Sequence, residues 1–121
     1  MVKNPDYNGL SVLCEFFDCN LKGIDLAQSL KSVFPDSKIE AFDNPECAVI
    51  LSNDSITTLT VFRKTNFVCA DIISYKDQKI PYQIVNPLKK ALKAKHFITM
   101  EIKRGISDRL NVSGTDISAH K

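Results

Sequence analysis

The chain has 121 residues, of which 44% are hydrophobic and 25% charged, as expected for one soluble globular domain. Sixteen Lys and Arg residues against fourteen Asp and Glu residues leave a formal net charge of +2, too small to predict nucleic-acid or membrane binding. The apolar runs are much shorter than the roughly 20 residues of a membrane span, and no signal-peptide core is evident, so we expect a cytoplasmic protein.

The four cysteines, Cys14, Cys19, Cys47 and Cys69, are dispersed without a Cys-x-x-Cys pair, and only two histidines accompany them. Structural zinc sites usually have closely spaced ligand pairs, so we expect no metal site. Each cysteine lies in or beside an apolar stretch, where a free thiol behaves as a small hydrophobic group. We therefore expect reduced cysteines in the core.

The first half of the chain predicts a strand, a helix and two further strands. Leu10 to Phe17 is an apolar, aromatic run typical of a buried strand. Apolar residues then recur at helical spacing over 24–34, and Pro35 ends the pattern because proline cannot continue a helix. Short strands are predicted at Ser37 to Phe42 and at Cys47 to Leu51, with a turn between them.

Two more strands follow, because Ser55 to Phe62 and Phe67 to Ser74 are rich in the β-branched and aromatic residues of half-buried strands. A turn at 63–66 separates them. Asp77 to Pro81 is expected to be a loop. A second helix is then predicted to begin at Asn86, a capping residue followed by proline at the first helical position.

The second predicted helix carries the one basic cluster of the sequence, formed by Lys89, Lys90, Lys93 and Lys95. We interpret this cluster as a solvated face that suits the negative end of the helix dipole, with a binding patch as the alternative. Phe97 to Ile102 alternates with polar neighbours and predicts the last strand. The domain is expected to span 1–105, and a polar tail to follow at 106–121.

The element order β-α-β-β-β-β-α-β predicts an α+β fold, a two-layer sandwich of a mostly antiparallel sheet with two helices on one face. The other face of such a sheet stays open. Because a second subunit would bury that face and complete a small core, we expect a homo-oligomer.

The first strand and the closing segments carry a family resemblance. Residues 12–19 read VLCEFFDC, residues 86–95 read NPLKKALKAK, and residues 101–105 read EIKRG. These segments resemble the opening strand, the second helix and the Glu-Ile-x-Arg-Gly ending of the small bacterial and archaeal S-adenosylmethionine decarboxylase proenzymes. The resemblance covers about residues 10–105 and implies the fold of that family.

The resemblance is weaker at the family's pyruvoyl motif. In the family, the chain cleaves itself before a serine that becomes a pyruvoyl group; Ser55 stands at that position, after Asp54 instead of glutamate. Five other family residues of the site are replaced here, at Cys47, Thr58, Thr60, Lys64 and Tyr75. The processing histidine corresponds to Thr60, which cannot act as an acid or base near neutral pH. These changes imply that the ancestral reaction, with its pyruvoyl cofactor, is lost.

Three functions stay open. The first is that the chain binds S-adenosylmethionine or a derivative as its small-molecule ligand and breaks it without a pyruvoyl group, as small sulfonium-cleaving lyases of phage origin do. The sulfonium is an activated leaving group, so the substrate's own carboxylate can displace methylthioadenosine. The second is a pyruvoyl-dependent decarboxylase of polyamine (spermidine) synthesis that uses Ser55. The third is a non-catalytic regulatory homologue.

Five residues are candidates for catalysis. Ser55, after Asp54, would be the pyruvoyl precursor of the second function, although Asn-Asp-Ser is also an ordinary hairpin turn. Tyr75 is a candidate acid, and Glu15 or Glu101 is a candidate base.

Five further residues are candidates for ligand binding. Phe42 and Phe62 could face the sulfonium and the adenine, with core packing as the alternative. Arg63 and Lys64 could hold an anion such as a phosphate, or simply form a charged turn. Asp71 matches an aspartate of the family's fifth strand, and a structural pairing with a lysine is the alternative. Other available aromatic residues are Phe16, Phe17 and Tyr75.

Overall fold

The computed structural model describes residues 7–106, which form a six-stranded sheet and two helices. The elements in chain order are β1 (Gly9–Phe17), α1 (Leu26–Val33), β2 (Lys38–Asp43), β3 (Glu46–Leu51), β4 (Ser55–Phe62), the short 3₁₀ helix η1 (Arg63–Thr65), β5 (Phe67–Ser74), α2 (Ile80–Leu92) and β6 (His96–Arg104). This order, and strand bounds within two residues of those expected, confirm the predicted α+β fold.

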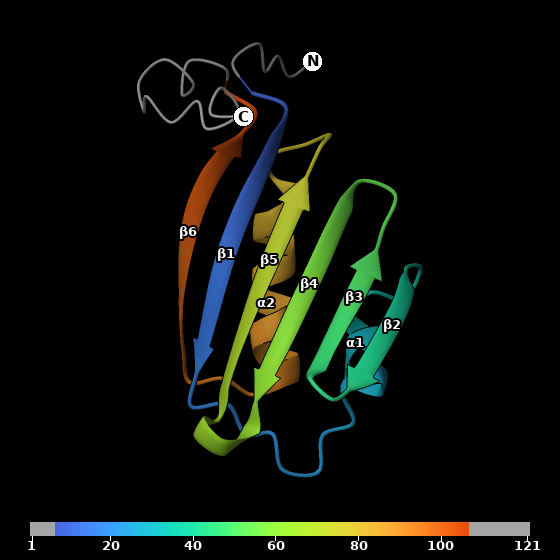
Figure 1. Ribbon diagram of the computed structural model, residues 1–121, viewed down its shortest axis with the longest axis vertical. Coiled ribbons are helices and arrows are strands. Elements are labelled where there is room, and N and C mark those ends of the chain that lie inside the picture. The colour runs from blue at the N-terminus through green and yellow to red at the C-terminus, as the bar shows by residue number, and fades with distance from the viewer. Residues whose placement is uncertain (1–6, 107–121) are drawn as a thin grey trace, which may run out of the picture.

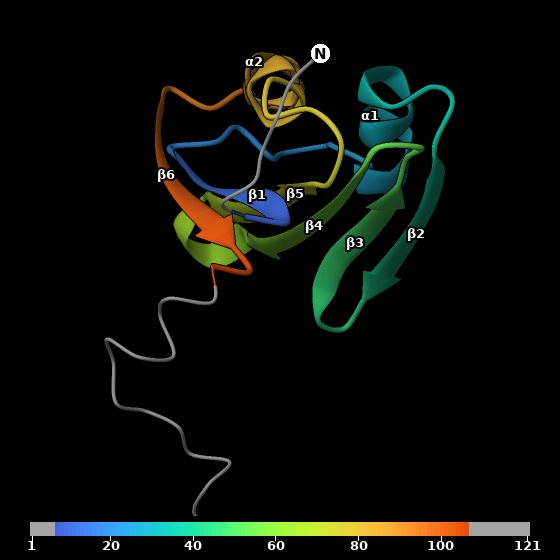
Figure 2. The same cartoon turned by 90° about the horizontal axis from the view of Figure 1, so that it is seen from above.

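All strand pairs are antiparallel, and the sheet order is β2-β3-β4-β5-β1-β6. The N-terminal strand therefore lies between β5 and the edge strand β6 (Figure 1). Both helices lie on one face of the sheet (Figure 2). None of the helices within residues 7–106 is long and apolar enough to cross a membrane.

The hydrophobic core lies between the sheet and the helices. Because side chains alternate across a strand, every second residue of the central strands enters this layer. Phe16 of β1, Ile72 of β5, Leu30 of α1 and Leu88 of α2 are all 0% exposed. One face of the sheet is therefore buried in the core, and the other face does not contact the helices.

Helix α1 follows the prediction but begins two residues later, at Leu26. The Asp25 side chain is the N-cap, because it accepts a hydrogen bond of 3.3 Å from the backbone N–H of Gln28. The helix places Leu26 and Leu30 in the core and ends before Pro35, as the sequence pattern predicts.

The predicted start of the second helix at Asn86 is wrong, because α2 already begins at Ile80. The loop expected over Asp77 to Pro81 is therefore shorter than predicted and ends at Lys79. Pro81 occupies the first turn, where a missing N–H costs no hydrogen bond, and Pro87 lies inside the helix. Burial of an apolar stripe stabilises α2 by more than the backbone hydrogen bond lost at Pro87 destabilises it. This stripe consists of Pro81, Val85, Leu88 and Leu92.

Replacing Pro87 with alanine is expected to raise the free energy of unfolding by about 1–3 kcal/mol, since proline inside a helix loses a backbone hydrogen bond and clashes with the preceding turn. Pro87 is exposed, so its removal opens no cavity. Urea denaturation followed by far-UV circular dichroism measures the change. A lower midpoint for the variant would contradict this account of α2.

Only Cys14 and Cys19 meet the expectation of core cysteines. All four cysteines are free thiols, but Cys47 and Cys69 are only half-buried and lie on the face away from the helices, which corrects the prediction for these two. Burial, with a smaller contribution from the charge of Asp71, raises the pKa of the Cys14 thiol to about 11. The Cys14 thiol is therefore protonated and unreactive at neutral pH.

At the C-terminal end, β6 runs two residues beyond the predicted strand, to Arg104. The Asn8 side chain donates a hydrogen bond of 3.1 Å to the carbonyl of Gly105. This bond links the segment before β1 to the segment after β6. The predicted tail lies outside the described residues except for Ile106.

Candidate functional site

The face of the sheet that the helices leave bare is called the open face below. The strand register gives its central residues, which are Val49 of β3, Ile56, Thr58, Thr60 and Phe62 of β4, Phe67, Cys69, Asp71 and Ile73 of β5, Ser11, Leu13, Glu15 and Phe17 of β1, and Ile98 and Met100 of β6. No described element lies over this face (Figure 2). A ligand or another chain can therefore reach it.

Two candidate residues far apart in sequence meet on the open face, on the neighbouring strands β1 and β5. Glu15 lies opposite Cys69 and Leu13 lies opposite Asp71, so the two carboxylate-bearing residues are diagonal neighbours on β1 and β5. Diagonal neighbours have Cα atoms about 7–8 Å apart. They line a hollow of about 230 Å³ together with Thr58, Thr60, Cys69 and Met100. The hollow therefore combines acidic, hydroxyl and apolar groups.

The Asp71 carboxylate is incompletely satisfied. Its Oδ1 atom is buried and has no hydrogen-bond partner among the described residues. A buried carboxylate oxygen without a partner is costly, because it has lost water and gained nothing in exchange. The lysine that the structural alternative would place beside Asp71 is not part of the hollow. The site therefore suits a cation or a hydrogen-bond donor.

Three phenylalanine rings form a row beside this pair. The Phe67 ring lies 5.3 Å from that of Phe17 and 5.6 Å from that of Phe62. Phe17 follows Glu15 by two residues, so the rings flank the carboxylates on the same face. Phe67 was not a sequence candidate, because only the register places it beside Phe17 and Phe62. Phe16, in contrast, is 0% exposed in the core and cannot contact a ligand.

A second group of candidates lies at one end of the sheet. Ser55 is opposite Ser74 on the core side, and its buried Oγ has no hydrogen-bond partner among the described residues. The Tyr75 hydroxyl donates to the Asn53 carbonyl at 2.7 Å, and the Tyr75 backbone N–H donates to the Asp54 carbonyl at 3.4 Å. Ser74 follows Asp71 by three residues, or about 10 Å of strand. This group is thus separate from the carboxylate pair.

Glu101 is not brought to the same site as Glu15. It lies opposite Val12, so its side chain is on the helix side of the sheet, where the Tyr82 hydroxyl of α2 donates to its carboxylate. That hydrogen bond, with smaller effects of burial and charge, raises the pKa of Tyr82 to about 12. Tyr82 was not a sequence candidate, because nothing in its local pattern links it to β6.

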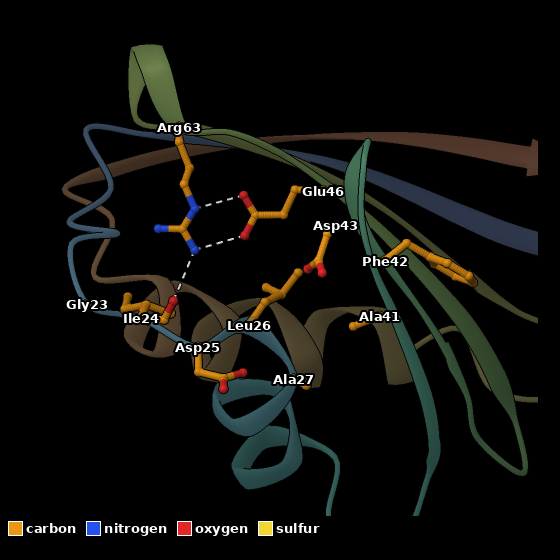
Figure 3. A pocket seen from close by; sticks show the side chains of 10 residues that line it. All are labelled: Gly23, Ile24, Asp25, Leu26, Ala27, Ala41, Phe42, Asp43, Glu46 and Arg63. Atoms are coloured by element: carbon orange, nitrogen blue, oxygen red, sulfur yellow. Dashed lines mark hydrogen bonds and ion pairs between the residues drawn. The ribbon is translucent and has the colours of Figure 1, made fainter.

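Arg63 is held by neighbouring groups of the same chain, although its side chain is 42% exposed (Figure 3). Its guanidinium donates to both carboxylate oxygens of Glu46 at 2.7 and 2.8 Å, and to the carbonyls of Leu21 and Ile24 at 2.7 and 3.0 Å. It borders a hollow of about 520 Å³ beside Phe42 and the start of α1. The predicted role of Arg63 in holding an anion is not supported, because these partners occupy four of its five N–H donors. Lys64, the next residue, is exposed on η1.

Replacing Arg63 with alanine is expected to lower the free energy of unfolding by about 1–2 kcal/mol, because several charge-assisted hydrogen bonds at a partly exposed site are lost. Lysine should not restore the stability, since an ammonium cannot form the two parallel bonds to Glu46. Chemical denaturation of both variants measures the effect. Full stability of Arg63→Lys would show that charge alone matters there.

The fold and the sequence place the chain among known proteins. The crystal structure of the adenosylmethionine decarboxylase from Aquifex aeolicus VF5 is similar, with a TM-score of 0.65 and 18% sequence identity over 84% of this chain and 93% of that chain. This likeness concerns the fold, an S-adenosylmethionine decarboxylase-like α+β sandwich. The sequence profile of S-adenosylmethionine decarboxylase matches residues 39–105, more than half of the chain.

The chain therefore belongs to the S-adenosylmethionine decarboxylase family, which confirms the resemblance in its sequence. A comparison with curated protein sequences gives no match.

Proposed function

We propose that the protein binds S-adenosylmethionine or a derivative of it on the open face and breaks it without a pyruvoyl group. The observation that carries the proposal is the pair of Glu15 and Asp71 on the open face of a family member, with the unpartnered Oδ1 of Asp71. S-adenosylmethionine carries a sulfonium and an ammonium group. Two carboxylates between apolar walls match these charges, because attraction between charges strengthens where water is scarce.

The phenylalanine row supports the same placement. Aromatic faces attract cations and stack on flat rings, so Phe17 and Phe67 offer contacts to the sulfonium and the adenine. The row lies two residues along the strands from Glu15, about 7 Å, which is within the reach of one nucleoside-sized ligand. Phe62, a candidate ligand-binding residue from the sequence, extends the row.

The proposed reaction needs no acid or base from the protein. A carboxylate oxygen of the substrate attacks its own γ-carbon, the bond from that carbon to sulfur breaks, and sulfur keeps the electron pair. The products are the neutral thioether methylthioadenosine and a lactone of the amino-acid part. The protein holds the substrate in the conformation that permits attack, which is a proximity effect. Thr60 in place of a histidine is compatible with this chemistry.

Incubation with S-adenosylmethionine tests the proposal, with methylthioadenosine followed by liquid chromatography. Product should accumulate in proportion to protein concentration, and the ligand should raise the thermal midpoint by mass action. S-adenosylhomocysteine is the matched control, because it lacks the sulfonium charge. Stabilisation without product would support the regulatory function instead. Absence of both product and stabilisation would reject binding and cleavage alike.

The pyruvoyl-dependent decarboxylase is the second candidate, and one contact favours it. The Tyr75 N–H donates to the Asp54 carbonyl, which is the group that the Ser55 hydroxyl would attack during self-cleavage. The surrounding residues fit a pyruvoyl group poorly, because Thr60 offers no proton-transfer group and the Ser55 side chain is on the core side. An intact mass near 13.6 kDa would eliminate this candidate, whereas fragments divided between Asp54 and Ser55 would establish self-cleavage.

A further inference from the structure

We propose that a hollow at one end of the sheet binds a small phosphorylated compound. The hollow, called the end hollow below, lies where β1 ends and β5 and β6 begin, at the lower end of the sheet in Figure 1. It has a volume of about 500 Å³ and is lined by Asp18, Cys19, Asn20, Lys22, Asn66 and Lys95. None of these residues lines the hollow that contains Glu15 and Asp71, so this inference does not rest on the proposed function.

Three turns that are far apart in the sequence form the backbone of the end hollow. The N–H of Cys19 donates to the Asn66 carbonyl at 2.9 Å, and the N–H of Asn20 donates to the Lys93 carbonyl at 3.1 Å. Asp18, Asn66 and Lys93 have left-handed backbone conformations, with φ of 53°, 54° and 52°, which reverse the chain sharply. The lining residues are therefore attached to a backbone that is formed before a ligand binds, and this lowers the ordering cost of binding.

The end hollow has an excess of positive charge. Lys22 and Lys95 line it, and neither ammonium group forms an ion pair among residues 7–106. Asp18 is the one carboxylate among the described lining residues, and its Oδ2 lies 3.9 Å from Nε2 of His96. The adjoining segment 86–96 contains four lysines and no acidic residue. The field at this end of the domain therefore attracts an anion.

The two lysines favour a phosphate monoester over other anions. At neutral pH a phosphate monoester carries about 1.5 to 2 negative charges and has three strong acceptor oxygens. Two ammonium groups can balance that charge and donate to these oxygens. A carboxylate carries a single charge and would leave one ammonium group unpaired. Extended nucleic acid is less favoured, because the whole chain has a net charge of only +2.

The size and the amide groups of the end hollow indicate an organic part on the phosphate. A volume of about 500 Å³ is in the range of small-molecule sites and exceeds the volume of one phosphate group. The side-chain amides of Asn20 and Asn66 offer donors and acceptors that can bind hydroxyl groups. We therefore expect a sugar phosphate, whose hydroxyl groups and phosphate match these two kinds of partner.

Isothermal titration calorimetry of the full chain at low salt tests the ligand class. Ribose 5-phosphate should bind at least about tenfold more tightly than inorganic phosphate, and ribose should give no measurable binding. Absence of ribose 5-phosphate binding would overturn the proposal. Equal affinities of ribose 5-phosphate and inorganic phosphate would overturn the assignment to a sugar phosphate. Tighter binding of a single-stranded oligonucleotide would do so in favour of nucleic acid.

Substitutions test where ribose 5-phosphate binds. The double variant Lys22→Gln, Lys95→Gln should raise the dissociation constant about 100-fold, because both charges that balance the phosphate are lost. Both lysines are exposed, so this variant should fold, which circular dichroism checks. The matched control Lys31→Gln, Lys38→Gln removes the same charge from α1 and the edge strand β2, and should change the constant by less than about twofold. Equal dissociation constants of the two double variants would exclude the end hollow.

A further variant separates the end hollow from the open face. Asp71→Asn should bind ribose 5-phosphate as the original chain does, because Asp71 lines the other hollow. A change of more than about tenfold in this variant would place the phosphate on the open face and contradict the proposed site. None of these measurements involves S-adenosylmethionine. A failure to cleave that compound would therefore reject the proposed function and leave the sugar-phosphate site standing.

Discussion

Replacing Asp71 with asparagine should lower kcat/KM for methylthioadenosine release by about 100-fold, or about 2.7 kcal/mol relative to free protein and free substrate, mainly because the charged substrate binds more weakly. The asparagine keeps the shape of the side chain but removes the negative charge that would face the sulfonium in the proposed complex. In the free protein it replaces a carboxylate whose Oδ1 has no partner among the described residues. Initial rates at several S-adenosylmethionine concentrations give kcat/KM for the comparison.

Two variants sharpen this result. Glu15→Gln should reduce kcat/KM in the same direction, because Glu15 is the diagonal neighbour of Asp71 in the hollow. Glu40→Gln should not, because Glu40 lies on the edge strand β2. Equal losses in all three variants would show an effect of overall charge. An unchanged rate in Asp71→Asn would exclude the carboxylate pair as the site of cleavage.

The stability of Asp71→Asn provides an independent readout of the same pair. Because the carboxylate is partly buried without a partner, its neutral replacement should unfold at an equal or higher urea concentration than the original chain. A variant that is more stable and less active is typical of a binding site that trades stability for function. Lower stability would instead indicate that Asp71 holds the sheet together.

The strands were predictable because their chemistry is local. Ser55–Phe62 and Phe67–Ser74 have the bounds that the sequence pattern predicts, since β-branched and aromatic residues fill both segments. The second helix was predicted poorly for the opposite reason. Pro87 is a strong local signal for a helix start, but packing of the buried stripe of α2 on the sheet outweighs it.

The site was predictable only as separate residues. Glu15 and Asp71 were both candidates, but their proximity depends on the insertion of β1 between β5 and β6 (Figure 1). Strand order and register are long-range properties that a periodic pattern does not contain. The same limit explains why Glu101 was grouped with Glu15 although it lies on the helix side. Alternation along a strand predicts which residues share a face of the sheet. Which residues of other strands lie beside them depends on strand pairing, which the local pattern does not contain.

Truncating Phe16 and Phe17 one at a time should give very different losses, although they are adjacent and identical. Phe16 is 0% exposed and packs near the Phe97 ring, so Phe16→Ala leaves a cavity and should cost about 3–5 kcal/mol. Phe17 is 36% exposed on the open face, so Phe17→Ala should cost about 1 kcal/mol, mainly from its contact with Phe67. Urea denaturation at low protein concentration gives both values.

The two losses differ because the two faces of the sheet have different surroundings. Folded domains are stable by only about 5–15 kcal/mol, so Phe16→Ala consumes a large part of that margin at any concentration. Phe17→Ala should remove only a small part, since the ring is 36% exposed and contacts mainly Phe67. Similar losses for both variants would mean that the open face is covered within the single chain. That result would contradict the site assigned to this face.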